Sequence, residues 1–177
     1  MRLHLGCGDK ILEGYVNVDI RSNLLCDKID DVKYLNEFES NSVEEIYASH
    51  VLEHFGRHEY KEVLKRWYEV LKKEGVLKIA VPNLKAVFEE YNNGKNLKSL
   101  WGFLYGGQTY EKNYHYVGFD FETLSEDLIE IGFDEITIWD WRSTDHSHID
   151  DFSQSYLPHM DKENGKLMSL NVKATKK

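Results

Sequence analysis

The chain has 177 residues, 41% of them hydrophobic and 13% aromatic, which is enough apolar material for one folded domain and excludes a mainly disordered chain. Lysine and arginine number 22 against 31 acidic residues, giving a formal net charge of −9. An acidic surface repels phosphate backbones, so nucleic acid is not an expected partner.

The cysteines and the N-terminal residues indicate a cytoplasmic protein. Only Cys7 and Cys26 are present, which is too few for a disulfide framework and not the spacing of a metal site. The first residues lack the apolar segment of a signal peptide, and no apolar run is long enough to span a membrane. We therefore expect a reduced, cytoplasmic domain without membrane contact.

Short β-type segments alternate with helical segments along the chain. Apolar runs predict strands at residues 3–5, 15–19, 43–48, 76–81, 135–139 and 167–172. Strands separated by helices are typical of an α/β protein, in which a mostly parallel sheet is covered on both faces.

Two helices are predicted between these strands. Apolar residues recur at helical spacing over residues 57–73, and Gly75 follows as a stop signal. The second helix covers residues 121–131, with Asp120 or Thr123 as its N-terminal cap and Gly132 at its end.

Two long segments fit no regular element. Residues 92–118 are rich in aromatic residues and glycine, and residues 142–165 are polar. Connections of this length in a small domain are usually functional or disordered, and the number of tryptophans and tyrosines speaks against disorder. We interpret both segments as loop insertions that form a substrate site.

A glycine turn and a strand-end carboxylate indicate a nucleoside ligand. The strand at residues 3–5 runs into Gly6-Cys7-Gly8, a turn whose bare backbone lets a ligand approach the end of a parallel strand. The next strand ends in Asp19, which can accept hydrogen bonds from both hydroxyls of a ribose. A dinucleotide-binding turn would have a third glycine where Ile11 stands, so a nucleotide-dependent oxidoreductase is the weaker alternative.

These motifs resemble those of the class I S-adenosylmethionine-dependent methyltransferases. The order and spacing match over residues 1–82, with a further fit at residues 115–133; the matching segments are Leu3 to Gly8, Asp19, Ala48 to His54 and Leu71 to Leu77. Within this superfamily the chain is most similar to small predicted methyltransferases often associated with surface-glycan genes. The resemblance implies a single domain over residues 1–177 with a Rossmann-like, doubly wound sheet that is mostly parallel and has an antiparallel last strand.

The resemblance also implies which residues bind S-adenosylmethionine. In the family these positions lie at the ends of the first four strands. In this sequence they are Leu5, Gly6, Cys7, Gly8, Asp19, Ile20, Asp31, Val32, Ser49 and His50. By analogy with the family, Ile20 packs on one face of the adenine and Val32 covers the base. Asp31 accepts the adenine amino group, with Asp30 as a near alternative.

The acceptor half of the site is less specific in sequence. His115 in the first long segment is a candidate general base, and Asp150 and Asp151 in the second are candidate catalytic acids or bases. The alternative for each is a structural side chain bonded to nearby backbone. We expect the acceptor to be a small molecule or a glycan. Trp101, Tyr105 and Tyr110 could stack on a sugar or another flat ring, or they could instead fill a small core. A catalytically silent cofactor-binding sensor or partner subunit is the alternative function.

No metal site is predicted. His50, His54 and His58 recur every four residues, but no tight set of cysteines or aspartates joins them. His146, His148, Asp150 and Asp151 are interpreted as part of a loop that handles the substrate, and the alternative is a solvated loop that caps its own turns.

Missing helices predict a homodimer. Only six residues separate Gly8 from Tyr15, so the helix that usually follows the first strand is reduced to about one turn. The link over residues 20–27 is short, and no helix is expected before the first strand. Part of the sheet would then need cover from the long loops or from a second copy of the chain.

Overall fold

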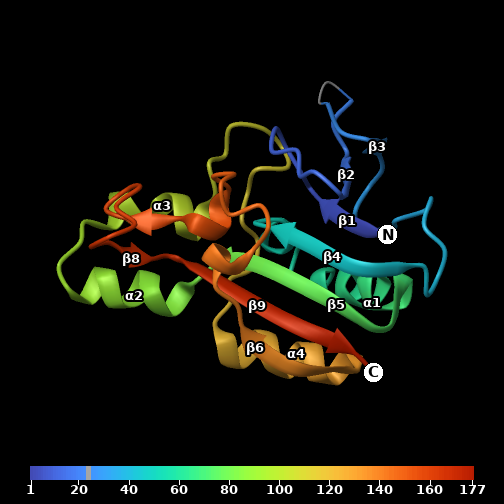
Figure 1. Ribbon diagram of the computed structural model, residues 1–177. Coiled ribbons are helices and arrows are strands. Elements are labelled where there is room, and N and C mark those ends of the chain that lie inside the picture. Colours follow the sequence, from blue (N-terminus) through green and yellow to red (C-terminus); the bar gives the residue numbers. More distant parts are fainter. Residues whose placement is uncertain (23–24) are drawn as a thin grey trace.

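A seven-stranded sheet in the order β3-β2-β1-β4-β5-β9-β6 forms the centre of the protein (Figure 1). The computed structural model describes residues 1–22 and 25–177. The strands are β1 (Arg2–Leu5), β2 (Val16–Asp19), β3 (Lys28–Ile29), β4 (Val43–Ser49), β5 (Leu71–Pro82), β6 (Phe133–Ile138) and β9 (Ser169–Lys176). The first five strands pair in parallel, whereas β9 is antiparallel to β5 and β6. This confirms the doubly wound, mostly parallel sheet with an antiparallel last strand.

In the described residues, four α-helices and several short elements connect the strands. The helices are α1 (Tyr60–Val70), α2 (Leu84–Asn92), α3 (Leu97–Tyr105) and α4 (Phe121–Ile131). Short 3₁₀ helices lie at η1 (Leu52–His54), η2 (Trp141–Ser143) and η3 (Phe152–Gln154), and β7 (Tyr156–Leu157) pairs with β8 (Lys166–Leu167) in a separate ladder. Within the described residues, no helix has the length and apolar character needed to cross a membrane.

The predicted helix over residues 121–131 is confirmed with its caps. The Asp120 side chain accepts a hydrogen bond from the Thr123 backbone N–H, and Gly132 follows with φ +121°. The other predicted helix is too long at both ends. Helix α1 ends at Val70 because Leu71 is already extended and begins β5, which runs without a break to Pro82.

The interpretation of residues 92–118 as wholly irregular is wrong. The end of α2 and all of α3 lie within this segment. Asn96 caps α3 by accepting from the Lys98 N–H, and Gly106 follows the helix with φ +75°. Gly102 lies inside α3, and a Cβ there would meet nothing within 4 Å, so packing does not require glycine at this position. Residues 106–118 form the loop that remains.

Helices α1 and α4 cover one face of the sheet. The fully buried side chains of Leu64, Trp67, Leu124 and Leu128 share one hydrophobic cluster with inward-facing residues of β1, β4, β5 and β9. Burial of this many large apolar side chains supplies most of the driving force for folding.

The chain's own loops cover the opposite face. No helix connects β1 to β2; residues 6–15 form turns, and from them Leu12 is buried against the sheet. Tyr47 of β4 packs here with Trp139, Trp141 and Tyr156 from the segment that follows β6. The reduced first helix is thus confirmed. The loops cover this face at Tyr47 and Ala80, whereas both residues of β3 are exposed. Residues 23 and 24, inside the predicted short link, lie outside the described residues.

A buried histidine lies under this second face. The Nδ1 atom of His4 lies 3.0 Å from Oδ1 of Asn17, which also accepts a hydrogen bond from the Leu12 N–H. The imidazole ring centre is 5.4 Å from that of Tyr47. Burial lowers the pKa of His4 to about 4, and the hydrogen bond to Asn17 offsets this only in part.

This burial makes the stability of the protein fall at mildly acidic pH. The unfolded chain binds a proton on His4 near its ordinary pKa of 6.5, whereas the folded chain excludes that proton down to about pH 4. The free energy of unfolding should therefore fall across this window, by about 1.4 kcal/mol per pH unit and about 3 kcal/mol in all from His4. Urea unfolding at a series of pH values, with wild type and His4→Phe compared, measures the difference. An equal pH dependence in the two proteins would contradict the assignment.

Candidate cofactor and acceptor site

The predicted cofactor residues lie at one edge of the sheet. Leu5 of β1 pairs with Val18 of β2 and with Ala48 of β4, so the three strands end side by side. The turn after β1, the end of β2 and the Ser49–His50 segment therefore come together at the carboxyl edge, where ligands bind in open parallel sheets.

The glycine turn has the bare backbone that a ligand requires. Gly6 and Gly8 adopt φ values of +62° and +57°, which favour glycine. A Cβ on Gly6 would lie 2.5 Å from a methyl group of Val51, so no other residue fits without a shift. Between them, the Cys7 thiol is buried, and burial raises its pKa to about 12, which excludes it as a nucleophile near neutral pH.

Asp19 is buried at the end of β2, and its carboxylate has four hydrogen-bond donors. Oδ2 accepts from the Gly8 N–H at 2.9 Å and from Arg21 Nη2 at 3.3 Å. Oδ1 accepts from the backbone N–H and Nε of Arg21, both at 3.0 Å. Burial alone would raise the pKa of Asp19, but these hydrogen bonds outweigh it and hold the pKa below its ordinary value.

The donor set shows how a ribose diol would fit. A carboxylate offers about four lone-pair positions, and all four are used here. The backbone donors are fixed, whereas the Arg21 guanidinium is at the end of a flexible side chain that is 37% exposed. The ribose hydroxyls can therefore reach Asp19 once Arg21 moves aside, and the edge fits an adenosine ligand.

The residues predicted around the adenine have different surroundings. Ile20 is 45% exposed at the carboxyl edge, as a side chain that packs on a base would be. Asp31 Oδ1 accepts from the Lys33 N–H, and Asp30 Oδ2 is 3.4 Å from the Glu37 nitrogen. Val32 is buried in the main hydrophobic cluster, so its side chain serves the core. Their roles toward the base stay predictions.

The end of β4 has an unusual backbone. His50 adopts φ +54°, a conformation that is uncommon outside glycine and that turns the chain from β4 into η1. Its N–H donates to the Ala80 carbonyl, and its Nε2 lies 3.1 Å from Ser169 Oγ. The Ser49 hydroxyl is buried and has no partner among the described residues. Both residues therefore stand at the carboxyl edge, beside the glycine turn.

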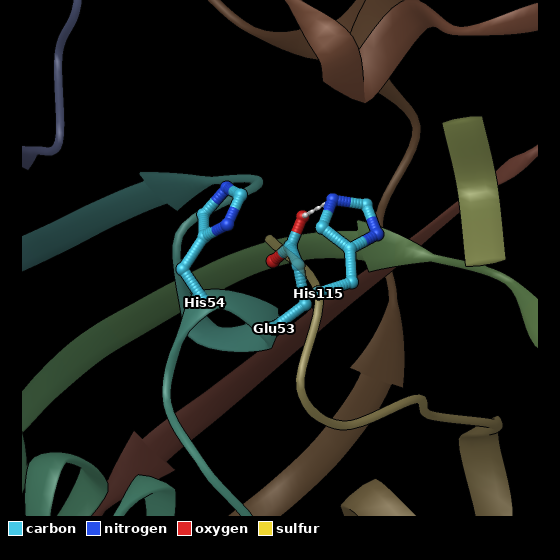
Figure 2. A group of neighbouring side chains, drawn as sticks. All are labelled: Glu53, His54 and His115. Carbon is cyan, nitrogen blue, oxygen red and sulfur yellow. Dashed lines mark ion pairs between the residues drawn. The ribbon is translucent and has the colours of Figure 1, made fainter. Parts of the chain in front are cut away.

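A buried glutamate lies beside these residues, between two histidines (Figure 2). Glu53 of η1 is fully buried, and its Oε1 is 3.2 Å from His50 Nδ1 and 3.9 Å from His115 Nε2. Burial alone would raise the pKa of Glu53, but the imidazoles of His50, His54 and His115 together lower it. Burial also lowers the pKa of His115, which favours its neutral form.

The three predicted catalytic residues do not come together. His115 joins Glu53 and His54, whereas Asp150 forms an exposed ion pair with Lys162 at 3.2 Å. The Asp151 carboxylate accepts hydrogen bonds from the Tyr47 hydroxyl at 2.5 Å and from the backbone N–H and hydroxyl of Ser153. These bonds cap η3 and give Asp151 a structural role, and its catalytic role stays a prediction.

Sequence reasoning did not find two residues of the site. Arg21 has no motif, and its contact with Asp19 becomes visible only in the structure. Glu53 lies in the segment Ala48 to His54, which resembles the methyltransferases, but the sequence assigns it no role. An acidic residue directly after Val51 and Leu52 was the available signal, because a carboxylate among apolar residues is often buried and paired.

Comparison with known proteins agrees with this fold. Residues 3–79 match a family model described as "Methyltransferase domain". The structure is similar to that of a SAM-dependent methyltransferase from Archaeoglobus fulgidus, with 17% identity, a TM-score of 0.61, and coverage of 99% of this chain and 85% of that one. For a SAM-dependent methyltransferase from Methanosarcina mazei, the identity is 15%, the TM-score 0.60 and the coverage 99% and 91%. For a possible histamine N-methyltransferase from Thermotoga maritima, the identity is 16%, the TM-score is 0.60, and the coverage is 99% of this chain and 82% of that one. No curated protein matches the chain.

The sheet order, the glycine turn and the strand-end acid define a Rossmann-like, nucleoside-binding domain. Residues 3–79 match the methyltransferase-domain model, and the whole chain has the fold of the S-adenosylmethionine-dependent methyltransferases to which it is similar; these findings support S-adenosylmethionine as the cofactor.

Loss of the Asp19 carboxylate should weaken cofactor binding. Removing two charge-assisted hydrogen bonds to the ribose costs about 2 kcal/mol or more, which is roughly a 30-fold or greater rise in Kd. Calorimetric titration of S-adenosylhomocysteine into wild type, Asp19→Ala and Asp19→Asn measures this. Asp9→Ala, at an exposed aspartate in the turn after β1, is the matched control. Unchanged affinity in both Asp19 variants would contradict the ribose assignment.

Removal of the Arg21 side chain should have the opposite effect. The guanidinium competes with the ribose for Asp19, and a half-exposed ion pair of this kind contributes up to about 1 kcal/mol. Arg21→Ala is therefore expected to tighten S-adenosylhomocysteine binding by up to about fivefold, whereas Arg57→Ala, at an exposed arginine, should leave it unchanged. Weaker binding to Arg21→Ala would show that the guanidinium contacts the cofactor instead of blocking it.

Proposed function

We propose that this protein is an active methyltransferase that transfers the methyl group of S-adenosylmethionine to a small-molecule or glycan-type acceptor. One observation supports activity over silent binding. The paired ends of β1 and β4 place the cofactor turn at Gly6 beside the segment that leads to Glu53, with His115 alongside. The cofactor half and a cluster of titratable groups thus share one edge of the sheet.

Each residue of the cofactor half has a defined task in this proposal. Bound S-adenosylmethionine supplies an electrophilic methyl group. The bare turn at Gly6 and Gly8 admits the cofactor, Asp19 orients its ribose, and the backbone at Ser49 and His50 lies along the methionine part. Methyl transfer is an in-line displacement, so holding the acceptor close and aligned supplies much of the catalysis.

The acceptor half is formed by residues 106–118, together with η1. The backbone N–H of Tyr116 donates to the Glu53 carbonyl, and Nδ1 of His54 is bonded to the Tyr114 carbonyl, so this loop is fixed over the end of β4. The side chains of Tyr105, Tyr110, Tyr114 and Tyr116 are 38–58% exposed, and such rings can stack on a sugar or another flat acceptor. This supports a small or glycan-type acceptor.

His115 has one nitrogen free for chemistry. Its Nδ1 is bonded to the Phe103 carbonyl at 3.0 Å, which leaves the lone pair on Nε2 directed toward Glu53. That lone pair can accept a proton from an acceptor or bind a metal ion, and it cannot do both at once.

The proposed activity predicts S-adenosylhomocysteine release in the presence of a suitable acceptor. The purified protein is incubated with S-adenosylmethionine and a panel of sugars, phenols and amines, and product is detected by mass spectrometry. Asp19→Asn should lose most turnover at low cofactor concentration, while Asp9→Asn keeps it. Tight cofactor binding with no turnover above background for any acceptor would favour the silent cofactor-binding protein. A cytoplasmic location and a homodimer stay predictions.

A further inference from the structure

The carboxylate of Glu53 has imidazoles nearby but no hydrogen bond within the described residues. Glu53 is fully buried, and neither of its oxygens has a hydrogen-bond donor in residues 1–22 and 25–177. His50 Nδ1 approaches Oε1 at 3.2 Å without forming a hydrogen bond. A carboxylate in such surroundings is costly unless a cation accompanies it.

The neighbouring imidazoles are oriented as metal ligands are. His54 donates its Nδ1–H to the Tyr114 carbonyl at 3.0 Å, and His115 donates its Nδ1–H to the Phe103 carbonyl at the same distance. Each ring therefore keeps its Nε2 lone pair free. Backbone carbonyls that fix the ring and tautomer in this way are the usual outer partners of metal-bound histidines.

The distances leave room for one ion. The ligand atoms of Glu53, His54 and His115 all lie within 4.8 Å of one another, and Glu53 lies between the two rings (Figure 2). Ligand atoms around a tetrahedral zinc ion are about 3.4 Å apart. Side-chain rotations that move the ligand atoms by roughly 1 Å would therefore bring all three to bonding distance from one ion.

We propose that Glu53, His54 and His115 form a binding site for a divalent transition-metal ion such as Zn²⁺ or Co²⁺. Two imidazoles and one carboxylate are a donor set that suits these ions and leaves at least one coordination position open. His50, whose Nε2 lies 3.1 Å from Ser169 Oγ, borders the Glu53 carboxylate on the other side, with its Nδ1 3.2 Å from Oε1. In this arrangement the ion supplies the positive charge that the buried Glu53 lacks.

The open position gives the acceptor a chemical class, and this part rests on the proposed function. His54 is partly exposed and is bonded to the aromatic loop at the Tyr114 carbonyl, so an acceptor held by that loop can reach the ion. A hydroxyl that binds the ion becomes more acidic and loses its proton to solvent. Its oxygen then forms a bond to the methyl carbon, the carbon–sulfur bond breaks, and the electron pair stays on sulfur as S-adenosylhomocysteine. The acceptor is thus a hydroxyl compound.

Co²⁺ titration of the chelator-treated, full-length protein tests the metal site. Wild type should develop a visible ligand-field spectrum that saturates at one equivalent and is removed by Zn²⁺. Glu53→Gln and His115→Ala should each raise the Kd for Co²⁺ by about 100-fold or more, because losing an outer partner alone already costs up to that much. His58→Ala is the matched control, since His58 is an exposed histidine four residues beyond His54.

Two outcomes would overturn the metal site. One is a wild type without a Co²⁺ spectrum, which would mean that a protonated imidazole balances Glu53 instead. The other is equal Co²⁺ affinity in wild type and in both variants. Calorimetry with S-adenosylhomocysteine shows that each variant is folded, because the cofactor turn follows β1 and contains neither substituted residue.

Activity measurements separate the acceptor class from the proposed function. Turnover of hydroxyl acceptors that is lost on chelation and restored by Zn²⁺ or Co²⁺ supports the inference. Metal-independent turnover overturns the role of the ion toward the acceptor and leaves the proposed function standing. If no acceptor is methylated under any condition, the proposed function fails and the acceptor class with it, while the Co²⁺ titration still decides the metal site.

Discussion

The parallel pairing of β1 with both β2 and β4 is the constraint on which the site depends. Because Leu5 pairs with Val18 on one side and Ala48 on the other, three strand ends meet at one edge without any help from side chains. The glycine turn, Asp19 and the η1 segment then become neighbours although they are up to about 50 positions apart in sequence. Geometry that the backbone imposes in this way survives extensive change in the loops.

The sequence predicted those parts of the fold that local chemistry determines. Helix α4 carries its own cap at Asp120 and its own stop at Gly132, and both lie where the residue types indicate. Helix α1 ends early because strand β5 continues back to Leu71, an effect of pairing with Val43 that no local pattern reveals. Helix α3 was missed because its glycine and aromatic residues are typical of loops, although Asn96 caps it.

The site, like the fold, has residues that the sequence predicts and residues that only the structure identifies. The glycine turn and Asp19 are short-range motifs, and the sequence identified both before the structure located them. The contact of Glu53 with His115 joins η1 to a loop about 60 residues later, and its meaning lies in burial and in ring orientation rather than in spacing. Asp151 is the reverse case, since its sequence context suggested chemistry and its three hydrogen bonds show a capping role.

The capping role of Asp151 connects the packing on the second face of the sheet with the site at the carboxyl edge. The segment after β6 packs Trp139 and Trp141 on Tyr47, and the Tyr47 hydroxyl in turn holds Asp151 at the start of η3. The next residue, Phe152, is thereby brought to the imidazole of His50, with ring centres 5.4 Å apart. One loop therefore covers the second face in place of the helix between β1 and β2, and it also positions Phe152 at the carboxyl edge. The usual first helix is dispensable here because a single segment does both.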